Sequence, residues 1–412
     1  MMLALLIALS QDVLDANASD QPRAHDIARS TKNGDIVVAW ANKAGDVQVR
    51  RFSAQSAWDA PVVVGSGAKE VSLAYGSDTW LVVWSTGDEV DARLLDANGA
   101  PAGSAFRVSD VAAAGDDTAP EAAWNAGKWL VVWSHTNMPL AQGRARFTAS
   151  FDINDDVRGR FVTPSGAGAA SFPIAEDALD SKNPSVAAAG DGFLTSWQEH
   201  PGKNRSPRVW GAPVSATGEV GLAAPYGIGT GANQVRPQVS SRADGESMMV
   251  WGAEGAVGAR RVQTDGKYAG KAVRIPNSDG GTPSIVHVPE RGQYLVVYER
   301  GTEQGGLDVY GMWVDERTGE SRGVDRLMRS RDHEHHGRAA MRPNGEPLTV
   351  AASTSGPETK LVVTYETYKG VDNSNHGTSK TCGGSATGPA GAPCTMIALA
   401  VVLALGLARR IA

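Results

Sequence analysis

The residues best suited to hold a metal ion lie in two short runs. In the first run, His333, His335 and His336 flank a glutamate, and imidazole and carboxylate ligands suit zinc or nickel. The run lacks the two histidines four positions apart that a helical zinc site uses. We therefore interpret it as a solvated polar loop, and these histidines as metal candidates that their spacing does not favour.

The second run contains Asp152 and Asp156, which belong to a set of oxygen-bearing side chains at alternate positions. Calcium-binding loops have such a pattern, but they also need glycine at the sixth position for a sharp turn. Valine stands there in this chain. The two aspartates are therefore disfavoured as metal ligands, and the sequence implies no cofactor.

A locally basic stretch is the third candidate site, because it lies in an acidic protein. The chain has 39 lysines and arginines against 45 aspartates and glutamates, a net charge of −6. This balance argues against nucleic acid as a partner, since nucleic-acid-binding proteins normally carry a basic footprint. The stretch suits an anionic polysaccharide or a carboxylate, and exposed loop charges without a ligand are the simpler interpretation. The candidate ligand-binding residues are Arg144, Arg146, Arg158, Lys203, Arg205 and Arg208.

Motifs for nucleophilic or metal-assisted catalysis are absent from the sequence. It contains no Gly-x-Ser-x-Gly elbow, no phosphate-binding P-loop and no His-Glu-x-x-His. An enzyme that cleaves carbohydrates needs instead two or three carboxylates that converge from distant segments. One sequence cannot show such convergence, so the catalytic residues are unknown and the sequence favours a non-catalytic protein.

The elements that would position these residues are repeated along the chain. Seven short β-rich runs end in an aromatic residue, and the final aromatics are 44, 49, 64, 54, 47 and 67 residues apart. Unequal spacing of this kind is typical of repeats with loop insertions. The runs are Asp35–Trp40, Trp80–Trp84, Trp129–Trp133, Phe193–Trp197, Ser247–Trp251, Tyr294–Tyr298 and Leu361–Tyr365.

Each run has other strand-like pieces around it. A piece that often begins with proline precedes the run, as at Pro237, and proline fits the first residue of a strand. A third piece reaches its turn glycine after 7 or 8 residues, as from Gly258 to Gly266, and a fourth closes the unit. Four short strands per unit predict an all-β fold, a β-propeller of about seven blades, with six complete repeats and a partial one.

These motifs resemble the degenerate Leu-Val-Val-Trp repeats of large secreted bacterial β-propellers, over residues 20–368. The resemblance implies a fold and no particular activity. Six blades with an extra hairpin is the alternative, and a chain of β-sandwiches is disfavoured because single units repeat, not pairs. The last unit shows only two strands, Leu348–Thr354 and Lys360–Glu366. We expect it to be incomplete or to borrow a strand from residues 11–20.

The expected topology separates two faces of the propeller. Connections from the second to the third strand, and from one blade to the next, emerge on one face, and the tight hairpins emerge on the other. The long insertions, residues 134–154, 198–207, 299–307 and 331–347, all fall in the first class. We call this side the long-loop face and the other the short-turn face. Because binding residues concentrate on loops over a rigid scaffold, we predict binding at the long-loop face.

Both ends of the chain have the composition of targeting segments. Residues 1–10 form an apolar run with a small-x-small close, which predicts a secretory signal peptide, although no basic residue precedes it. An ordinary apolar N-terminus is the alternative. At the other end, residues 369–393 form a spacer rich in Gly, Ser and Thr, and residues 394–412 hold an apolar stretch before Arg409 and Arg410. Its 13 apolar residues make a helix of only about 20 Å, shorter than a hydrocarbon core of about 30 Å.

The order of cysteine, polar spacer, short apolar helix and arginine pair resembles the MYXO-CTERM sorting tail of myxobacterial surface proteins, over about the last 31 residues. This resemblance implies removal of the helix by a sorting protease and attachment of lipid at Cys382. The tail departs from the pattern in having few basic residues at its end and an additional Cys394. A disulfide between the two cysteines and a plain tail anchor are the alternatives.

Together these features predict an exported protein, held at the cell surface or outer membrane by its C-terminal tail. Residues 11–19 are an N-terminal segment before the propeller. The expected function is non-catalytic binding or adhesion to an extracellular glycan or protein. Further partners would be the sorting and processing machinery of the envelope and the membrane. The alternatives are a carbohydrate-active hydrolase or lyase with its active site in the central channel, and a structural envelope component.

Overall fold

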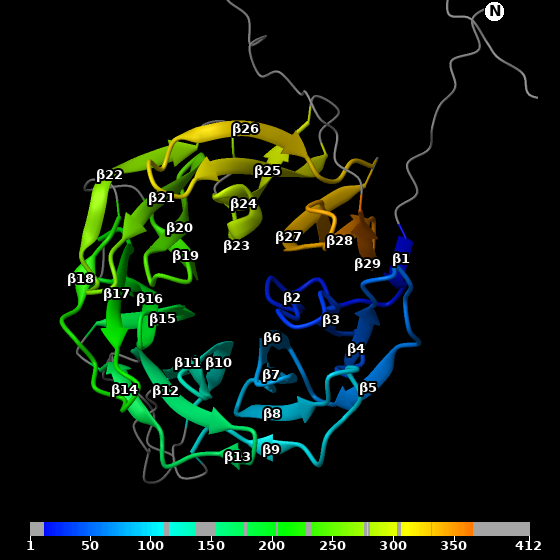
Figure 1. Ribbon diagram of the computed structural model, residues 1–412, viewed down its shortest axis with the longest axis horizontal. Coiled ribbons are helices and arrows are strands. Elements are labelled where there is room, and N and C mark those ends of the chain that lie inside the picture. Colours follow the sequence, from blue (N-terminus) through cyan, green and yellow to red (C-terminus); the bar gives the residue numbers. More distant parts are fainter. Residues whose placement is uncertain are drawn as a thin grey trace, which may run out of the picture. The chain divides into compact units, whose positions relative to one another are not determined.

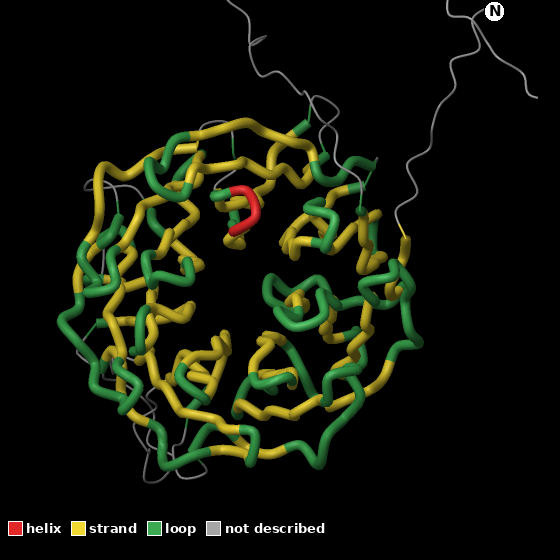
Figure 2. The backbone as a smooth tube through the Cα atoms, in the orientation of Figure 1, coloured by secondary structure: helices red, strands yellow, loops and turns green. Residues whose placement is uncertain are grey.

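The computed structural model describes residues 12–110, 115–136, 154–176, 179–202, 205–227, 233–275, 278, 281–302, 306–330 and 332–365. These residues form seven antiparallel sheets, which are arranged as blades around a central opening (Figure 1). Strands and turns account for nearly all of this part of the chain, and its one helix is the short 3-10 helix η1 (Pro289–Arg291) (Figure 2). The protein is thus a seven-bladed β-propeller, as predicted.

Each blade has the same strand order from the central opening outward. The innermost strands are β2 (His25–Arg29), β6 (Glu70–Gly76), β10 (Asp117–Asn125), β15 (Asp180–Ala189), β19 (Val235–Ser241), β23 (Ser284–Val288) and β27 (His333–Met341). The second strands are β3 (Ile36–Ala41), β7 (Thr79–Ser85), β11 (Lys128–Thr136), β16 (Gly192–His200), β20 (Ser247–Ala253), β24 (Gln293–Gly301) and β28 (Pro347–Ser355). We number the blades 1 to 7 in this order.

The outer half of each blade is less regular. The third strands are β4 (Val47–Phe52), β8 (Val90–Leu95), β12 (Asp155–Thr163), β17 (Arg208–Val214), β21 (Ala256–Val262), β25 (Leu307–Asp315) and β29 (Glu358–Thr364). The outermost strands are β5 (Val62–Gly65), β9 (Phe106–Arg107), β13 (Gly166–Ala167), β14 (Phe172–Ala175), β18 (Ala224–Pro225), β22 (Tyr268–Ile275), β26 (Ser321–Arg326) and β1 (Asp12–Asp15). Blade 3 has both β13 and β14 against its third strand.

The apolar side chains do not form one core but several clusters between blades. The second strands read as continuous apolar runs because both of their faces are covered, and all six residues of β3 are buried. Seven hydrophobic clusters occur among the described residues, each built from two neighbouring blades. The repeated aromatics fill these clusters, since Trp40, Trp84, Trp133, Trp197 and Trp251 are fully buried. They pack between blades, as expected, and do not form a surface for stacking on sugars.

Close packing also explains one glycine of the repeat. A side chain at Gly76 would place its Cβ 2.1 Å from Cγ of Trp124 in the next blade. The positive φ angles of this hairpin fall on Ser77 (52°) and Asp78 (59°) instead. Gly76 is therefore required by the approach of a neighbouring indole ring and not by the turn itself.

The ring is closed by a strand from the N-terminal end of the chain. β1 pairs antiparallel with β29, so blade 7 combines three strands from the C-terminal part with one from the N-terminal part. Leu14 enters the cluster between blades 7 and 1, and Oδ2 of Asp15 accepts a 2.7 Å hydrogen bond from Nε1 of Trp40. The expected borrowed strand is thus present, and it binds blade 7 to blade 1.

The predicted boundaries of the last repeat are wrong by one strand. Tyr365 follows β29, which is the third strand of blade 7, and Ala351 of β28 occupies the position of the other aromatics. The innermost strand β27 lies inside residues 331–347, which the sequence placed in a long loop. The sequence pattern does not show this strand because its first half is polar. Polar residues are tolerated there because the strand is the edge that faces the central opening.

The terminal segments can be compared with the structure only in part. The apolar residues 1–10, the spacer, Cys382 and the segment 394–412 lie outside the described residues. Within the described ranges, no helix is long and apolar enough to span a membrane.

Candidate functional site

The innermost strands present one equivalent residue each toward the middle of the propeller. The register defines this position, since each such residue pairs with the residue just before the aromatic position of the second strand, as Glu121 pairs with Val132. All seven residues at this position are polar or charged. We call them the ring residues: Asp26, Ser72, Glu121, Ser185, Gln238, Ser284 and Arg338.

Four of the innermost strands have a β-bulge two residues before the ring residue. The bulges place non-glycine residues at positive φ, namely Ala119 (52°), Asn183 (53°), Arg236 (49°) and His336 (59°). Such strained positions in several strands at one level usually mark a site with a special role. Proline follows the bulged residue in three of these strands. It therefore lies inside the strand, whereas the sequence pattern predicts it at the first residue of the strand.

The bulged backbone is held by side chains of the neighbouring blade. Oγ of Ser134 accepts a 3.0 Å hydrogen bond from the amide of Asn183. Oε1 of Glu299 accepts a 2.6 Å bond from the amide of His336. In both cases the acceptor directly follows the aromatic position of the second strand. These contacts offset the cost of the bulge and lock successive blades together.

The ring residues also satisfy the free edges of the innermost strands. Oδ2 of Asp26 accepts a 2.9 Å hydrogen bond from the amide of Leu73 in the next blade. Oγ of Ser185 accepts a 3.2 Å bond from the amide of Val239. An innermost strand has no strand partner on its central side, so its backbone groups need such acceptors. The first role of the ring residues is therefore structural.

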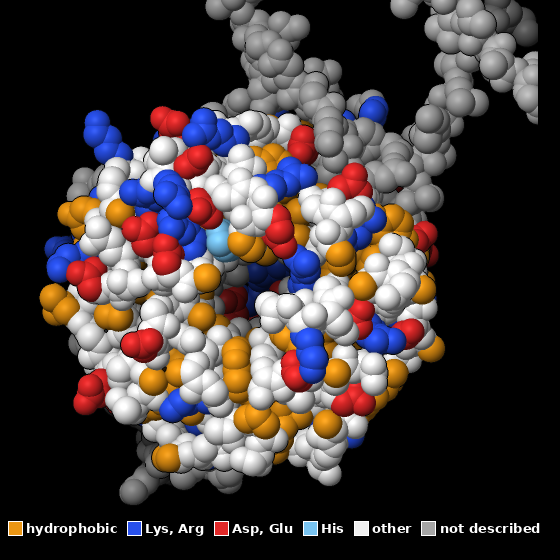
Figure 3. Space-filling model, viewed as in Figure 1, with side chains coloured by type: hydrophobic (Ala, Val, Ile, Leu, Met, Phe, Trp, Pro, Cys, Tyr) orange, Lys and Arg blue, Asp and Glu red, His pale blue; other side chains and the backbone are white. Residues whose placement is uncertain are grey.

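The longer ring residues and Arg23, which precedes β2, form a charged network across the central opening. The guanidinium of Arg23 lies 3.2 Å from the carboxylate of Glu121 and donates to the carbonyl of Pro184, also at 3.2 Å. The amide of Gln238 also donates to Glu121, and Arg338 donates to Gln238 at 2.6 Å. These residues belong to blades 1, 3, 4, 5 and 7. Charged side chains are visible inside the central opening in the space-filling view (Figure 3).

Burial and charge act in opposite directions on this network. Burial lowers the pKa of Arg23, while the carboxylates of Glu121 and Glu70 raise it. Burial raises the pKa of Asp26, and the guanidinium of Arg338 opposes that shift. Glu70 in turn accepts a hydrogen bond from the bulged amide of Ala119. The carboxylates of Asp26, Glu70 and Glu121 are thus all engaged by donors of the protein itself.

Two histidines on the long-loop side of the opening, His25, which is buried, and His336, which is partly buried, are neutral. Burial lowers the pKa of His25 to about 3, and its Nε2 donates to the carbonyl of His336 at 2.8 Å. Burial also lowers the pKa of His336, whose ring meets that of His335 edge-on at 4.6 Å. Nε2 of His335 is hydrogen-bonded to the hydroxyl of Thr354 at 2.7 Å.

The structure does not bring the proposed metal ligands together. His335 and His336 lie on β27 with the contacts just described, and His333 at the start of that strand is exposed. Asp156 is buried on β12, and Asp152 lies outside the described residues. Across the described parts of the chain, no three His, Cys, Asp or Glu side chains lie close enough to share a metal ion.

The basic candidates are divided by the structure. Arg144, Arg146 and Lys203 lie outside the described residues. Arg158 on β12 is partly buried, 3.7 Å from Glu176 and 3.4 Å from the hydroxyl of Ser171. Arg205 and Arg208 are exposed on the long-loop side of blade 4, and among the described residues their guanidinium groups have no partner.

A cavity of about 520 Å³ lies where the central opening meets the short-turn face. Its walls come from blades 1, 5, 6 and 7, with apolar Ala28 and Val286 beside the hydroxyl of Ser240. At its edge Arg29 and Glu290 form a 3.1 Å ion pair. The cavity mixes apolar walls with a few convergent polar groups, as ligand pockets do.

No sequence motif marks the ring residues, although the sequence holds a signal for them. In blades 3, 4, 5 and 6, the ring residue directly follows the proline that precedes the second-strand run, as Glu121 follows Pro120. An alignment of the repeats on this proline would have placed Glu121, Ser185, Gln238 and Ser284 in one column. That column mixes charged, amide and hydroxyl groups, so no single residue type marks it.

The fold and this centre define the class of the protein, a seven-bladed β-propeller with a polar, internally hydrogen-bonded channel. No known family matches the sequence, and no curated protein does. The structure is similar to the BP39L lectin of Burkholderia pseudomallei, with a TM-score of 0.58 at 11% identity, over 86% of this chain and 99% of the lectin. It is also similar to the polysaccharide lyase Uly1, with a TM-score of 0.50 at 10% identity, over 84% of this chain and 90% of the lyase. At these identities the likeness concerns the fold alone.

Proposed function

We propose that this protein is a non-catalytic binding module for an extracellular anionic glycan, which it holds through its long-loop face. The observation that carries the proposal is the pair of exposed guanidinium groups of Arg205 and Arg208, which have no partner among the described residues. A guanidinium group forms paired hydrogen bonds with a carboxylate or sulfate. Both residues stand on a rigid blade beside a connection of the long-loop face, where binding groups concentrate.

The state of the central channel supports binding over catalysis. Glu121 accepts from both Arg23 and Gln238, and Asp26 accepts from backbone amides. A retaining or inverting glycosidase needs one carboxylic acid and one carboxylate that face the substrate. Carboxylates held by internal donors are poorly placed for that work. A lectin has the same fold, which agrees with a binding role.

Catalysis is the second candidate, and one observation favours it. Arg23, Arg236, Arg338 and Glu121 converge on the central opening, as the enzyme hypothesis expects. A carbohydrate-active enzyme would use this group for substrate binding and proton transfer. It would release new reducing or unsaturated ends from its substrate, whereas a binding module would leave the polymer unchanged.

Binding can be tested with a uronic-acid polymer as the probe. We expect polygalacturonate to bind the wild-type protein at low salt and to bind about tenfold more weakly at 0.5 M NaCl, because exposed charges are screened. The double variant Arg205→Gln/Arg208→Gln should lose at least about fivefold in affinity, roughly 1 kcal/mol. Isothermal titration calorimetry measures both effects, and an assay of reducing and unsaturated ends runs in parallel.

A matched control removes the same charge elsewhere. Lys271→Gln/Arg317→Gln takes two exposed cations from the outermost strand of blade 5 and from a short turn of blade 6. If this control weakens binding as much as the test variant, the effect is one of net charge and the site is wrong. If new reducing or unsaturated polymer ends appear in the reaction mixture, the function is catalysis and not binding.

We also propose that the propeller is exported and held at the cell surface through its C-terminal tail. The support is the sequence of residues 369–412, with its spacer, Cys382 and apolar stretch. One acyl chain holds a protein only marginally, so two or more chains are expected at Cys382. Intact-mass spectrometry of the native membrane fraction should show loss of the residues that follow the Cys382 region and an added lipid mass, absent in Cys382→Ala. An unmodified Cys382 with residues 395–412 retained would overturn this anchor.

A further inference from the structure

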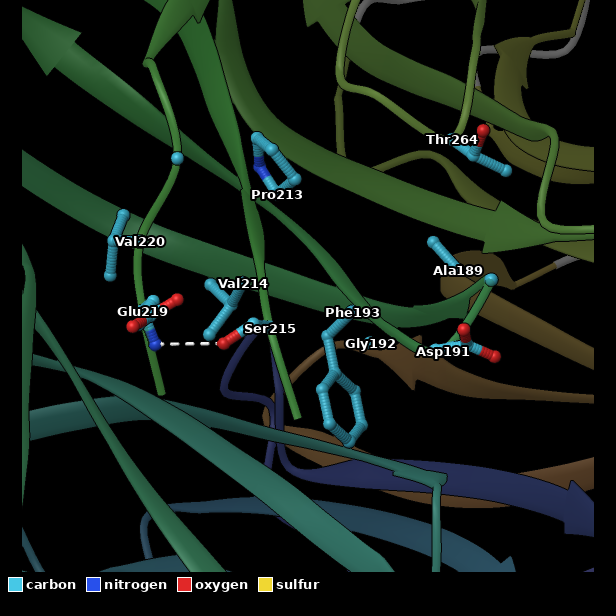
Figure 4. Close-up of a pocket in the computed structure, with 12 residues that line it drawn as sticks. Ala189, Asp191, Gly192, Phe193, Pro213, Val214, Ser215, Glu219, Val220 and Thr264 are labelled. Atoms are coloured by element: carbon cyan, nitrogen blue, oxygen red, sulfur yellow. Dashed lines mark hydrogen bonds between the residues drawn. The ribbon is translucent and has the colours of Figure 1, made fainter. Parts of the chain in front are cut away.

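The short-turn face carries a second cavity, which the proposed glycan site does not use. It has a volume of about 630 Å³ and lies at the junction of blades 4 and 5. Its walls are the turn of residues 189–193, the segment 213–221 and Thr264 from a turn of blade 5 (Figure 4). All three segments connect strands on the side opposite Arg205 and Arg208.

The floor of this cavity is apolar. Its lining includes Pro213 and Val220, which are partly exposed, and Phe193 and Val214, which are each 1% exposed. Leu222, which directly follows Gly221 of the cavity wall, is 91% exposed. A leucine so open to water, next to an apolar hollow, is the kind of feature that marks a contact surface for another molecule.

Two carboxylates stand on opposite sides of this floor. Figure 4 shows Asp191 on one side and Glu219 on the other, with Phe193 and Val214 between them. Both side chains are exposed, and within the described residues neither meets a hydrogen-bond donor or a cation. The situation differs at the adjacent turn of blade 5, where Asp265 is 2.6 Å from Lys267.

The walls that carry these carboxylates are held in place by blade 3. Nδ2 of Asn125 donates to the carbonyl of Gly190 at 2.9 Å, and Nζ of Lys128 donates to the carbonyl of Ala216 at 2.6 Å. The ammonium of Lys128 also lies 4.5 Å from the ring centre of Phe161, so it is already in use. A side chain at Gly192 would place its Cβ 2.3 Å from the carbonyl oxygen of Val214. The cavity is thus preorganised, which lowers the entropic cost of binding.

We propose that this cavity binds a lysine or arginine side chain of a partner protein, with a neighbouring apolar residue of that partner on Leu222. Two unpaired carboxylates above an apolar floor fit a long aliphatic side chain with a cationic end. A sugar ring would need an exposed aromatic face for stacking, and the ring of Phe193 is covered. The protein would then hold an anionic glycan on one face and a cationic protein segment on the other.

The test titrates an acetylated, amidated Leu-Lys-Leu peptide into the full-length protein, and amide NMR detects its binding. We expect saturable changes in chemical shift confined to residues 189–193, 213–222 and 264. The dissociation constant should be just below about 1 mM, a weak affinity, because each exposed charge pair contributes little. Asp191→Asn/Glu219→Gln should weaken binding at least fivefold. Both side chains are exposed and unpaired, so the melting temperature of this variant should equal that of the wild type.

Controls separate this site from general attraction between charges. Asp88→Asn/Glu254→Gln removes two exposed carboxylates from the long-loop face and should leave peptide binding unchanged. A Leu-Glu-Leu peptide should not bind. Equal binding of that peptide, equal loss in the control variant, or no saturable shift with Leu-Lys-Leu would overturn the proposal. Tighter binding of a glucosamine trimer would also overturn it, because the cavity would then take an amino sugar.

Discussion

Replacing Glu121 with glutamine is expected to lower the free energy of unfolding by about 3 kcal/mol, because it removes the carboxylate that is paired with a buried arginine. The side chains of Arg23 and Glu121 are 5% and 14% exposed, and their ion pair spans the central channel at 3.2 Å. Within the described residues, Nη2 of Arg23 has no hydrogen-bond partner even in the wild type. Loss of the carboxylate charge therefore cannot be made up by water at this site. Urea unfolding followed by tryptophan fluorescence measures the change.

Two comparison variants make this result specific. The double variant Arg23→Met/Glu121→Leu removes both charges and should regain most of the stability, since an apolar pair often replaces a buried ion pair at little cost. Glu290→Gln breaks the more exposed 3.1 Å pair with Arg29 and should cost less than about 1 kcal/mol. If Glu121→Gln is no more destabilising than Glu290→Gln, the network does not hold the channel together. Unchanged stability with a lost polymer-cleaving activity would assign Glu121 to catalysis instead.

Between pH 5 and pH 8 the wild type should lose stability relative to the variant Glu334→Gln. Glu334 is wholly buried at the contact of blades 6 and 7. One oxygen of its carboxyl group accepts a hydrogen bond from the hydroxyl of Ser330. Burial raises the pKa of Glu334 from 4.5 to about 7, and the nearby carboxylates of Asp308 and Asp332 act in the same direction. The folded protein therefore keeps a proton that the unfolded chain releases.

The sign of the pH effect follows from that difference. Below about pH 4.5 both states bind the proton, and the stabilisation is complete. As the pH rises toward 7, only the folded state keeps this proton, so the contribution of Glu334 to stability falls by up to about 3 kcal/mol and then levels off. A glutamine is neutral throughout. Wild type and Glu334→Gln should have similar melting temperatures at pH 5, and the variant should be the more stable at pH 8.

The matched control for this experiment is Glu358→Gln in the same blade, whose carboxylate is exposed 3.8 Å from Lys360. It should follow the wild type at every pH. Melting curves at pH 5, 6, 7 and 8 give the comparison. A difference between wild type and Glu334→Gln that stays constant across this range would show that Glu334 is ionised in the folded protein, contrary to this prediction.

The second strands were predictable because their residues are buried on both faces. Runs such as Trp80–Trp84 therefore show as apolar segments with a fixed aromatic end, whatever the loops between them. The same rule failed for the last repeat. Blade 7 has Ala351 at the aromatic position, and Tyr365 follows a third strand. The sequence pattern predicts a loop at β27 because some of its polar residues find partners far away in the sequence, as Arg338 does with Gln238.

The sequence by itself thus determined the repeat and the class of fold, since each unit carries the same local pattern of burial, and it named residues 11–20 as one source of a closing strand. It also placed Arg205 in a connection of the long-loop face, with Arg208 directly after that connection. Only the tertiary structure decided which polar groups meet at the centre. Arg23 and Glu121 are 98 residues apart, and the two carboxylates of the short-turn cavity come from different turns of blade 4. Their distances depend on how blades curve and close into a ring, which no local pattern of residues contains.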